Sequence, residues 1–139
     1  MTVLYTAEVT ATGAGRDGRT RSSGGVLDLD LAVPKELGGP GAFATNPEQL
    51  FATGYAACFH SALQVVARRA KADIAGSSVT AQVGIGPNGQ GGYGLSVGLV
   101  VDLPGVPREQ AQELATAADE VCPYSNAVRG NVEIDLRVA

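Results

Sequence analysis

The segment from Leu50 to Ala67 constrains the fold most, because it is apolar around almost its whole circumference when drawn as a helix. Asn46 before it is a favoured N-cap residue, and Pro47 suits the first position of a helix. Arg68 and Arg69 follow it with charges that favour a helix C-terminus. A surface helix shows a single apolar stripe, so this segment is predicted to be a long helix buried on most sides.

The rest of the sequence alternates between strand-like and helical patterns. Alternation of apolar and polar residues, together with turn residues, predicts extended segments at 3–12, 19–31, 79–85, 95–103 and 132–138. Pro107 begins an amphipathic helix that ends near Val121, and a short helical segment begins at Cys122. Strands in hairpins with a buried helix indicate an α+β fold rather than a doubly wound parallel sheet. The length fits a single domain over 1–139.

Composition adds limits on partners and location. Charged residues make up 17% of the chain, against a typical share of about 25%, so part of the surface is predicted to be hidden against a partner. The net charge of −4 and the pI near 4.8 argue against nucleic acid or an anionic membrane as that partner. No apolar run reaches the roughly 18 residues that span a bilayer. The N-terminus carries no secretory signal, so we expect a cytoplasmic protein without membrane insertion.

Two cysteines do not make a disulfide-rich scaffold, so they are either inert or redox-active. Cys58 lies in the middle of the predicted helix, where a free cysteine is most often a small buried hydrophobe. Cys122 lies at a predicted helix start, where the helix dipole lowers the pKa of a thiol. Electrostatics alone therefore favours Cys122 as the reactive thiol, and Cys58 needs a cation from elsewhere in order to ionise.

Residues 13–18 match the pattern G-x-G-x-x-G, but an extended segment follows them instead of a helix. That context lacks the helix N-terminus that binds the pyrophosphate of a dinucleotide. The glycines are instead predicted to shape a hairpin tip that presents Arg16. Arg16, Arg19 and Arg21 are the candidate cations for Cys58, although arginines on a hairpin are more often simply solvated.

Glu48 lies in the first turn of the predicted helix, where the dipole favours a carboxylate, and it is able to orient an arginine. Positions 48 and 58 differ by 10, which is about 15 Å along a helix axis, and their side chains point in different directions. One arginine therefore cannot contact both Glu48 and Cys58 along a straight helix. Either the helix is interrupted near Gly54, or the two residues come from different subunits. The single histidine, His60, does not share a helix face with Cys58, and one histidine with two distant cysteines argues against a metal site.

Two segments resemble the signatures of the organic hydroperoxide resistance (Ohr) proteins, which belong to the OsmC-like superfamily. The first runs from Asn46 to Phe59, and the second from Cys122 to Asn131. The resemblance extends over essentially the whole chain, including Gly15 to Gly18. It implies an OsmC-like fold, in which an antiparallel sheet packs around a long central helix. It also implies an intertwined homodimer with two active sites at the subunit interface.

The resemblance further implies a thiol peroxidase that reduces organic hydroperoxides, including those of fatty acids, to alcohols. It makes Cys58 the peroxidatic thiolate, Cys122 the resolving thiol, and Arg16 and Glu48 the activating pair. This order of the two thiols is the reverse of the one expected from electrostatics. No cofactor is expected to be bound, and the implied reductant is a dihydrolipoyl group, usually on a lipoylated protein, rather than thioredoxin.

Substrate preference and two alternatives stay open. Apolar residues near Cys58, namely Leu50, Phe51 and Phe59, would suit an alkyl hydroperoxide better than hydrogen peroxide. One alternative is an OsmC-type peroxidase of different substrate preference. The other is a non-catalytic redox-sensing or ligand-binding module that uses the same thiols. Sustained turnover with a dihydrolipoyl reductant separates the enzymes from a sensor, which is oxidised once and then stops.

Overall fold

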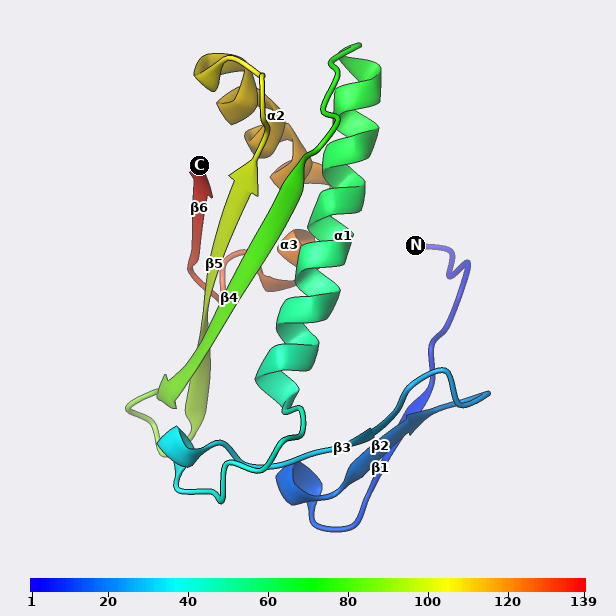
Figure 1. Ribbon diagram of the computed structural model, residues 1–139, viewed down its shortest axis with the longest axis vertical. Coiled ribbons are helices and arrows are strands. Elements are labelled where there is room, and N and C mark those ends of the chain that lie inside the picture. Colours follow the sequence, from blue (N-terminus) through cyan, green and yellow to red (C-terminus); the bar gives the residue numbers. More distant parts are fainter. The chain divides into compact units, whose positions relative to one another are not determined.

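A computed structural model describes all residues from Met1 to Ala139 and divides the chain into two compact units, Met1–Leu50 and Phe51–Ala139. The elements in chain order are β1 (Val9–Thr12), β2 (Arg19–Ser22), β3 (Asp28–Asp30), α1 (Pro47–Arg69), β4 (Ser78–Pro87), β5 (Tyr93–Asp102), α2 (Arg108–Val121), α3 (Pro123–Val128) and β6 (Ile134–Val138) (Figure 1). The chain thus combines helices with strands that pair mostly in hairpins, which confirms the α+β prediction. The assignment of one domain to residues 1–139 stays a prediction.

The Met1–Leu50 unit contains a three-stranded antiparallel sheet in the order β1-β2-β3. The predicted strand at 3–12 is shorter than expected, because only its last four residues, Val9–Thr12, pair with β2. A 3₁₀ turn, Gly15–Asp17, forms the tip of the first hairpin, which confirms that no helix follows the glycine motif. Glycine is required at position 18, because a Cβ there would lie 2.1 Å from the carbonyl oxygen of Thr12.

The Phe51–Ala139 unit contains a second three-stranded sheet in the order β4-β5-β6. β4 and β5 form the predicted antiparallel hairpin, whereas β6 pairs with β5 in parallel. The expected α+β fold with a long helix is present, but it contains two sheets, and the sheet of this unit is mixed rather than antiparallel. The parallel pairing arises because β6 returns to β5 through α2 and α3, and such a crossover brings a strand back in the same direction.

The long helix α1 begins and ends as predicted. The Asn46 side chain caps it by accepting a hydrogen bond of 2.8 Å from the backbone N–H of Gln49. The helix runs without interruption through Gly54, which removes one of the two explanations for the separation of Glu48 and Cys58. In Figure 1, α1 runs lengthwise beside the β4–β5–β6 sheet. Its buried side chains join those of β5 and α2 in one core, and the α1 members are Tyr55, Phe59, Ala62, Leu63, Val66 and Ala67.

Within the single chain, α1 is buried along one face and exposed along another. An exposed stripe follows the helix at a spacing of three to four residues, comprising Thr53, Ala57, Ser61, Gln64 and Arg68. With 23 residues and a mean hydropathy of 1.3, α1 is long enough and apolar enough to cross a membrane, although we expected no such segment from the sequence. Core helices often share this length and hydropathy, and one face of α1 belongs to the core of Phe51–Ala139.

Candidate thiol site

The two cysteines, Cys58 and Cys122, are free thiols that meet within the Phe51–Ala139 unit. Cys58 lies on α1 and is partly exposed, whereas Cys122 has no exposed surface. Cys122 is the C-cap residue of α2 and the N-cap residue of α3, and its backbone is extended between the two helices. The two side chains lie close enough for Cys122 to shift the pKa of Cys58. The fold thus brings together the two thiols that lie far apart in the sequence.

The surroundings of Cys58 disfavour its thiolate. Burial raises the pKa of Cys58, and the neighbouring Cys122 side chain raises it further through charge and hydrogen bonding. The backbone N–H of Tyr124 opposes this by hydrogen bonding to the sulfur, which lowers the pKa. No cation is among these groups. The expectation that Cys58 needs a cation from elsewhere therefore agrees with its environment in this unit.

A cluster of aromatic rings lies beside the thiols. Tyr124 packs against Phe51 and Tyr55, with ring centroids 6.1 and 5.5 Å away. Gly54 on α1 makes room for this ring, because a Cβ at position 54 would lie 2.4 Å from the Tyr124 hydroxyl oxygen. Both residues lie in the segments that resemble the Ohr signatures, but the resemblance gave neither of them a role in the site. The position of Tyr124 two residues after Cys122 was the only sequence feature that pointed to it.

The predicted apolar surroundings of Cys58 need one correction. Phe59 has no exposed surface and belongs to the core, so it cannot face a substrate. It follows Cys58 directly on α1, and adjacent helical residues point in different directions. Phe51 is only partly buried and lies against Tyr124. Phe51 therefore stays a candidate for the apolar wall and Tyr124 takes the place of Phe59. Leu50 is half-buried in the other unit.

Arg16 and Glu48 are in contact within the Met1–Leu50 unit, as predicted. Arg16 Nη1 donates to Glu48 Oε2 at 2.9 Å and Arg16 Nη2 donates to Oε1 at 2.6 Å, so the pair is bidentate. The hydrogen bond to Arg16 lowers the pKa of Glu48, and the bond to Glu48 raises the pKa of Arg16. The Glu48 side chain is 12% exposed and that of Arg16 is 40% exposed. Arg16 is thus held in place while part of its guanidinium stays accessible.

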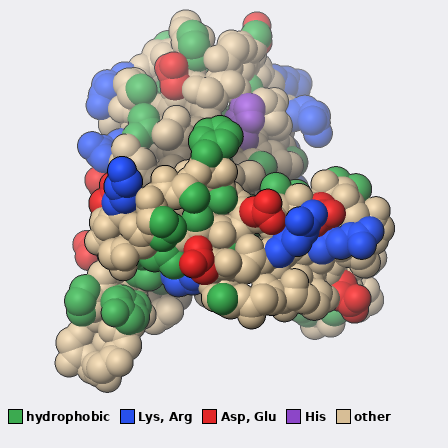
Figure 2. Space-filling view, turned by 60° about the horizontal axis from the view of Figure 1, so that its bottom comes forward, with side chains coloured by type: hydrophobic (Ala, Val, Ile, Leu, Met, Phe, Trp, Pro, Cys, Tyr) green, Lys and Arg blue, Asp and Glu red, His purple; other side chains and the backbone are tan.

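The other candidate cations are placed differently. Arg19 forms ion pairs with Asp28 at 2.7 Å and with Asp30 at 3.3 Å on the exposed sheet. Arg21 lies on the same strand, β2. Figure 2 shows basic and acidic side chains next to one another on the surface, as these exposed ion pairs require. The solvated-hairpin interpretation therefore suits Arg19 but not Arg16.

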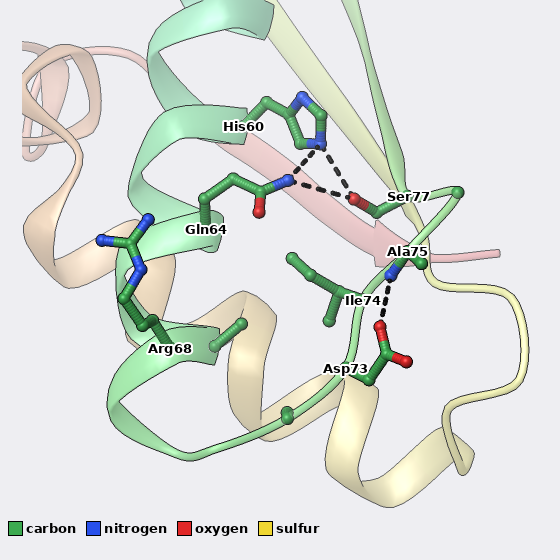
Figure 3. A pocket seen from close by; sticks show the side chains of 10 residues that line it. His60, Gln64, Arg68, Asp73, Ile74, Ala75 and Ser77 are labelled. Atoms are coloured by element: carbon green, nitrogen blue, oxygen red, sulfur yellow. Dashed lines mark hydrogen bonds between the residues drawn. The ribbon is translucent and has the colours of Figure 1, made fainter.

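His60 lies in a cavity of about 390 Å³ that contains neither cysteine. His60 Nε2 and Ser77 Oγ are 2.9 Å apart, and Gln64 Nε2 lies 3.3 Å from the same histidine nitrogen. Figure 3 shows these three side chains turned toward one another between α1 and the start of β4. Their polar groups bond mutually, so the cluster ties α1 to β4. No group of three or more His, Cys, Asp or Glu residues is arranged to hold a metal ion.

Comparison with known proteins identifies the class to which this fold and thiol pair belong. The model of the OsmC-like protein family matches residues 38–137. The chain therefore belongs to the OsmC-like family.

More similar relatives narrow this assignment. The organic hydroperoxide resistance protein of Xanthomonas axonopodis pv. citri (strain 306) is 51% identical over 138 residues, which cover 99% of this chain and 96% of that protein. The crystal structure of an organic hydroperoxide resistance protein from Elizabethkingia anophelis matches with a TM-score of 0.95 at 50% identity, covering 100% of this chain and 99% of that one. OhrB of Bacillus subtilis matches with a TM-score of 0.90 at 47% identity, covering 99% and 100%. Within the OsmC-like family, the chain is similar throughout its length to organic hydroperoxide resistance proteins.

Proposed function

We propose that this protein is a thiol-dependent peroxidase that reduces organic hydroperoxides to alcohols. The observation that carries the proposal is the pair of free thiols that the fold brings close together, one partly exposed and the other fully buried. Relatives of about 50% identity bear the name organic hydroperoxide resistance protein, which supports the substrate class. The proposal includes a cytoplasmic location, where free thiols stay reduced between turnovers.

The proposed reaction has three steps. The Cys58 thiolate attacks the terminal, hydrogen-bearing oxygen of the hydroperoxide and the O–O bond breaks, which leaves Cys58 as a sulfenic acid. The departing alkoxide takes up a proton equivalent to the one that the Cys58 thiol released on ionising, and leaves as the alcohol. The Cys122 sulfur then attacks the Cys58 sulfur and displaces the hydroxyl group as water, forming a disulfide. An external dihydrolipoyl dithiol returns both cysteines to thiols by exchange and is itself oxidised to a disulfide.

Arg16, held in place by Glu48, supplies the missing cation in this mechanism. A guanidinium beside Cys58 would lower the pKa of that thiol and stabilise charge that develops on the peroxide oxygens. Glu48 keeps the guanidinium oriented through two charge-assisted hydrogen bonds. Since α1 runs unbroken from Glu48 to Cys58, we propose that each Cys58 receives its Arg16–Glu48 pair from the second subunit of a homodimer.

The surface of the Met1–Leu50 unit supports a homodimer. Of its hydrophobic residues, only Leu31 and Ala32 are buried. Large hydrophobic side chains of this unit are instead exposed, including Leu4, Val26 and Phe43, each more than 90% exposed. Burial of these side chains against a second copy would remove apolar surface from water. The low share of charged residues points the same way.

A peroxidase assay with purified protein tests the proposal. We expect sustained consumption of cumene hydroperoxide with dihydrolipoamide as reductant and little with thioredoxin. Hydrogen peroxide is expected to be a poorer substrate, because Phe51 and Tyr124 offer an apolar wall to an alkyl group. Equal rates with both peroxides would instead favour an OsmC-type peroxidase of different preference.

Two substitutions test the roles of the thiols. Cys58→Ser should abolish turnover, whereas Cys122→Ser should still allow one oxidation per chain without efficient recycling. A protein that is oxidised once by the hydroperoxide, and is not turned over by any dithiol, would be a redox sensor and would exclude the peroxidase.

A further inference from the structure

The second signature segment carries an arginine that the proposed mechanism does not use. Arg129 Nη2 donates to the backbone carbonyl oxygen of Asp119 at 2.8 Å and to its carboxylate Oδ2 at 3.1 Å. Arg129 Nη1 donates to the side-chain oxygen of Asn126. Asp119 lies near the end of α2 and Asn126 lies in α3. One guanidinium thus joins the two helices that meet at Cys122.

Cys122 is the hinge between these helices. Its N–H closes the last turn of α2 on Ala118 at 2.9 Å, and its carbonyl accepts the first α3 bond from Asn126 at 3.0 Å. Its own backbone is extended, with φ −67° and ψ 121°, so the direction of α3 relative to α2 depends on this residue. Because Asp119 precedes Cys122 and Asn126 follows it, Arg129 fixes the angle at the hinge from both sides.

The Asp119 carboxylate makes Arg129 harder to replace. Asp119 Oδ1 is buried and has no hydrogen-bond partner, so the ion pair through Oδ2 is its compensation. Loss of the guanidinium would leave a partly buried carboxylate without its cation, which is costly in a low-dielectric site. The end of α2 would then shift to let water reach Asp119, and Cys122 lies three residues further along.

We propose that Arg129 is a positioning residue for the resolving step, holding Cys122 so that its sulfur reaches Cys58. This inference rests on the proposed peroxidase function. A disulfide requires the two sulfurs to come within about 2.05 Å of each other at a defined dihedral angle, so small displacements of the hinge slow its formation. No bond to the Cys122 sulfur forms or breaks when Cys58 attacks the hydroperoxide, whereas the disulfide requires that sulfur to reach Cys58. Arg129 is therefore expected to act far more strongly on the second step than on the first.

A competing reaction makes this step measurable. The Cys58 sulfenic acid either loses water with the Cys122 thiol to form the disulfide, or reacts with a second hydroperoxide to give a sulfinic acid and an alcohol. The ratio of sulfinic acid to disulfide reports the rate of resolution against a known peroxide concentration. General loss of stability would not change this ratio among the molecules that remain folded.

The test compares Arg129→Gln with the parent and with Arg137→Gln in the full chain. Arg137 is a matched control, because it also pairs with an aspartate at 3.1 Å, on the exposed side of β6. Reduced protein is mixed rapidly with cumene hydroperoxide, and sulfenic acid, disulfide and sulfinic acid are quantified by mass spectrometry after quenching. For Arg129→Gln we expect oxidation of Cys58 within about twofold of the parent and disulfide formation slowed roughly tenfold to a hundredfold, the effect of a misplacement near 1 Å.

Asn126→Ala is a milder second variant that keeps the Asp119 ion pair, and it should raise the sulfinic fraction by a smaller amount. Its use keeps the test decisive if Arg129→Gln does not fold. The inference is overturned if Arg129→Gln or, in its place, Asn126→Ala forms the disulfide at the parent rate, or if Arg137→Gln slows it equally. A parent protein whose Cys58 is not oxidised would overturn the proposed function itself, which is a distinguishable result.

Discussion

The buried hydrogen bond between Tyr55 and Ser125 allows a quantitative test of how α3 is attached to α1. Tyr55 Oη and Ser125 Oγ are 2.7 Å apart, and neither residue has any exposed surface. Burial raises the pKa of Tyr55, so the hydroxyl stays neutral and able to donate. Tyr55→Phe would leave the Ser125 hydroxyl in the core without this partner, which costs about 1–3 kcal/mol of unfolding free energy.

A double-mutant cycle separates the hydrogen bond from the loss of an atom. Ser125→Ala alone leaves the Tyr55 hydroxyl without this partner and should cost a similar amount. Tyr55→Phe with Ser125→Ala removes both groups, so we expect the double variant to be less destabilised than the sum, with a coupling of about 0.5–3 kcal/mol. Urea unfolding followed by circular dichroism, at one fixed protein concentration, measures each corner of the cycle.

Tyr93→Phe is the control for this cycle, because Tyr93 lies on β5 with 72% of its surface exposed. It should leave stability within about 0.5 kcal/mol of the parent. The reasoning is refuted if Tyr55→Phe is as stable as the Tyr93→Phe control. It is equally refuted if the effects of the two single substitutions simply add, since paired hydroxyls must couple.

Three further predictions concern the other contacts. Gly54→Ala should displace the Tyr124 side chain and so weaken the hydrogen bond from the Tyr124 backbone N–H to the Cys58 sulfur. The pH midpoint for alkylation of Cys58, measured in a Cys122→Ser background, should therefore rise. Because Arg16 lowers the pKa of Glu48, their pair stabilises the fold above the unfolded-state pKa of Glu48 and is lost as the pH falls through the lowered folded value. The difference in unfolding free energy between the parent and Glu48→Gln should therefore shrink between about pH 7 and about pH 3, which urea titrations at several pH values would measure. Asn46→Ala removes the α1 cap and should cost about 1 kcal/mol in the same assay.

The helices and the hairpins could be predicted from local signals, whereas the pairing of the last strand could not. Asn46 and Pro47 define the start of α1 because capping and the fixed φ of proline act within one turn of chain. The alternation at 132–138 shows that a strand forms there, but it does not say which strand it pairs with. Pairing of β6 with β5 depends on the path of the chain through α2 and α3, which no local pattern encodes. The exposed stripe of α1 could not be predicted for a related reason, since an apolar sequence does not reveal which partner covers each face.

The site divides in the same way between what chemistry and what packing determines. The cysteines could be singled out because the chain has only two, whereas Arg16 and Glu48 were given their roles by the resemblance to the Ohr signatures. Gly54 could not, since its significance is the space it leaves for a ring contributed by Tyr124, far away in sequence. The sequence showed Arg129 only as one residue of a signature segment, and its role became apparent from its hydrogen bonds to residues on both sides of Cys122.

Accessibility, not the helix dipole, explains how the two thiols can act in a fixed order. Cys122 lies at the start of α3, but a hydroperoxide cannot reach a sulfur without exposed surface. Cys58 is partly exposed, yet its own unit raises its pKa and provides no cation. In the proposed mechanism the Cys58 thiol is therefore weakly ionised in the single chain, and it becomes a thiolate only beside Arg16 of the second subunit. Oxidation of Cys58 should then depend on dimerisation as strongly as on Arg16 itself, since either loss removes the same positive charge.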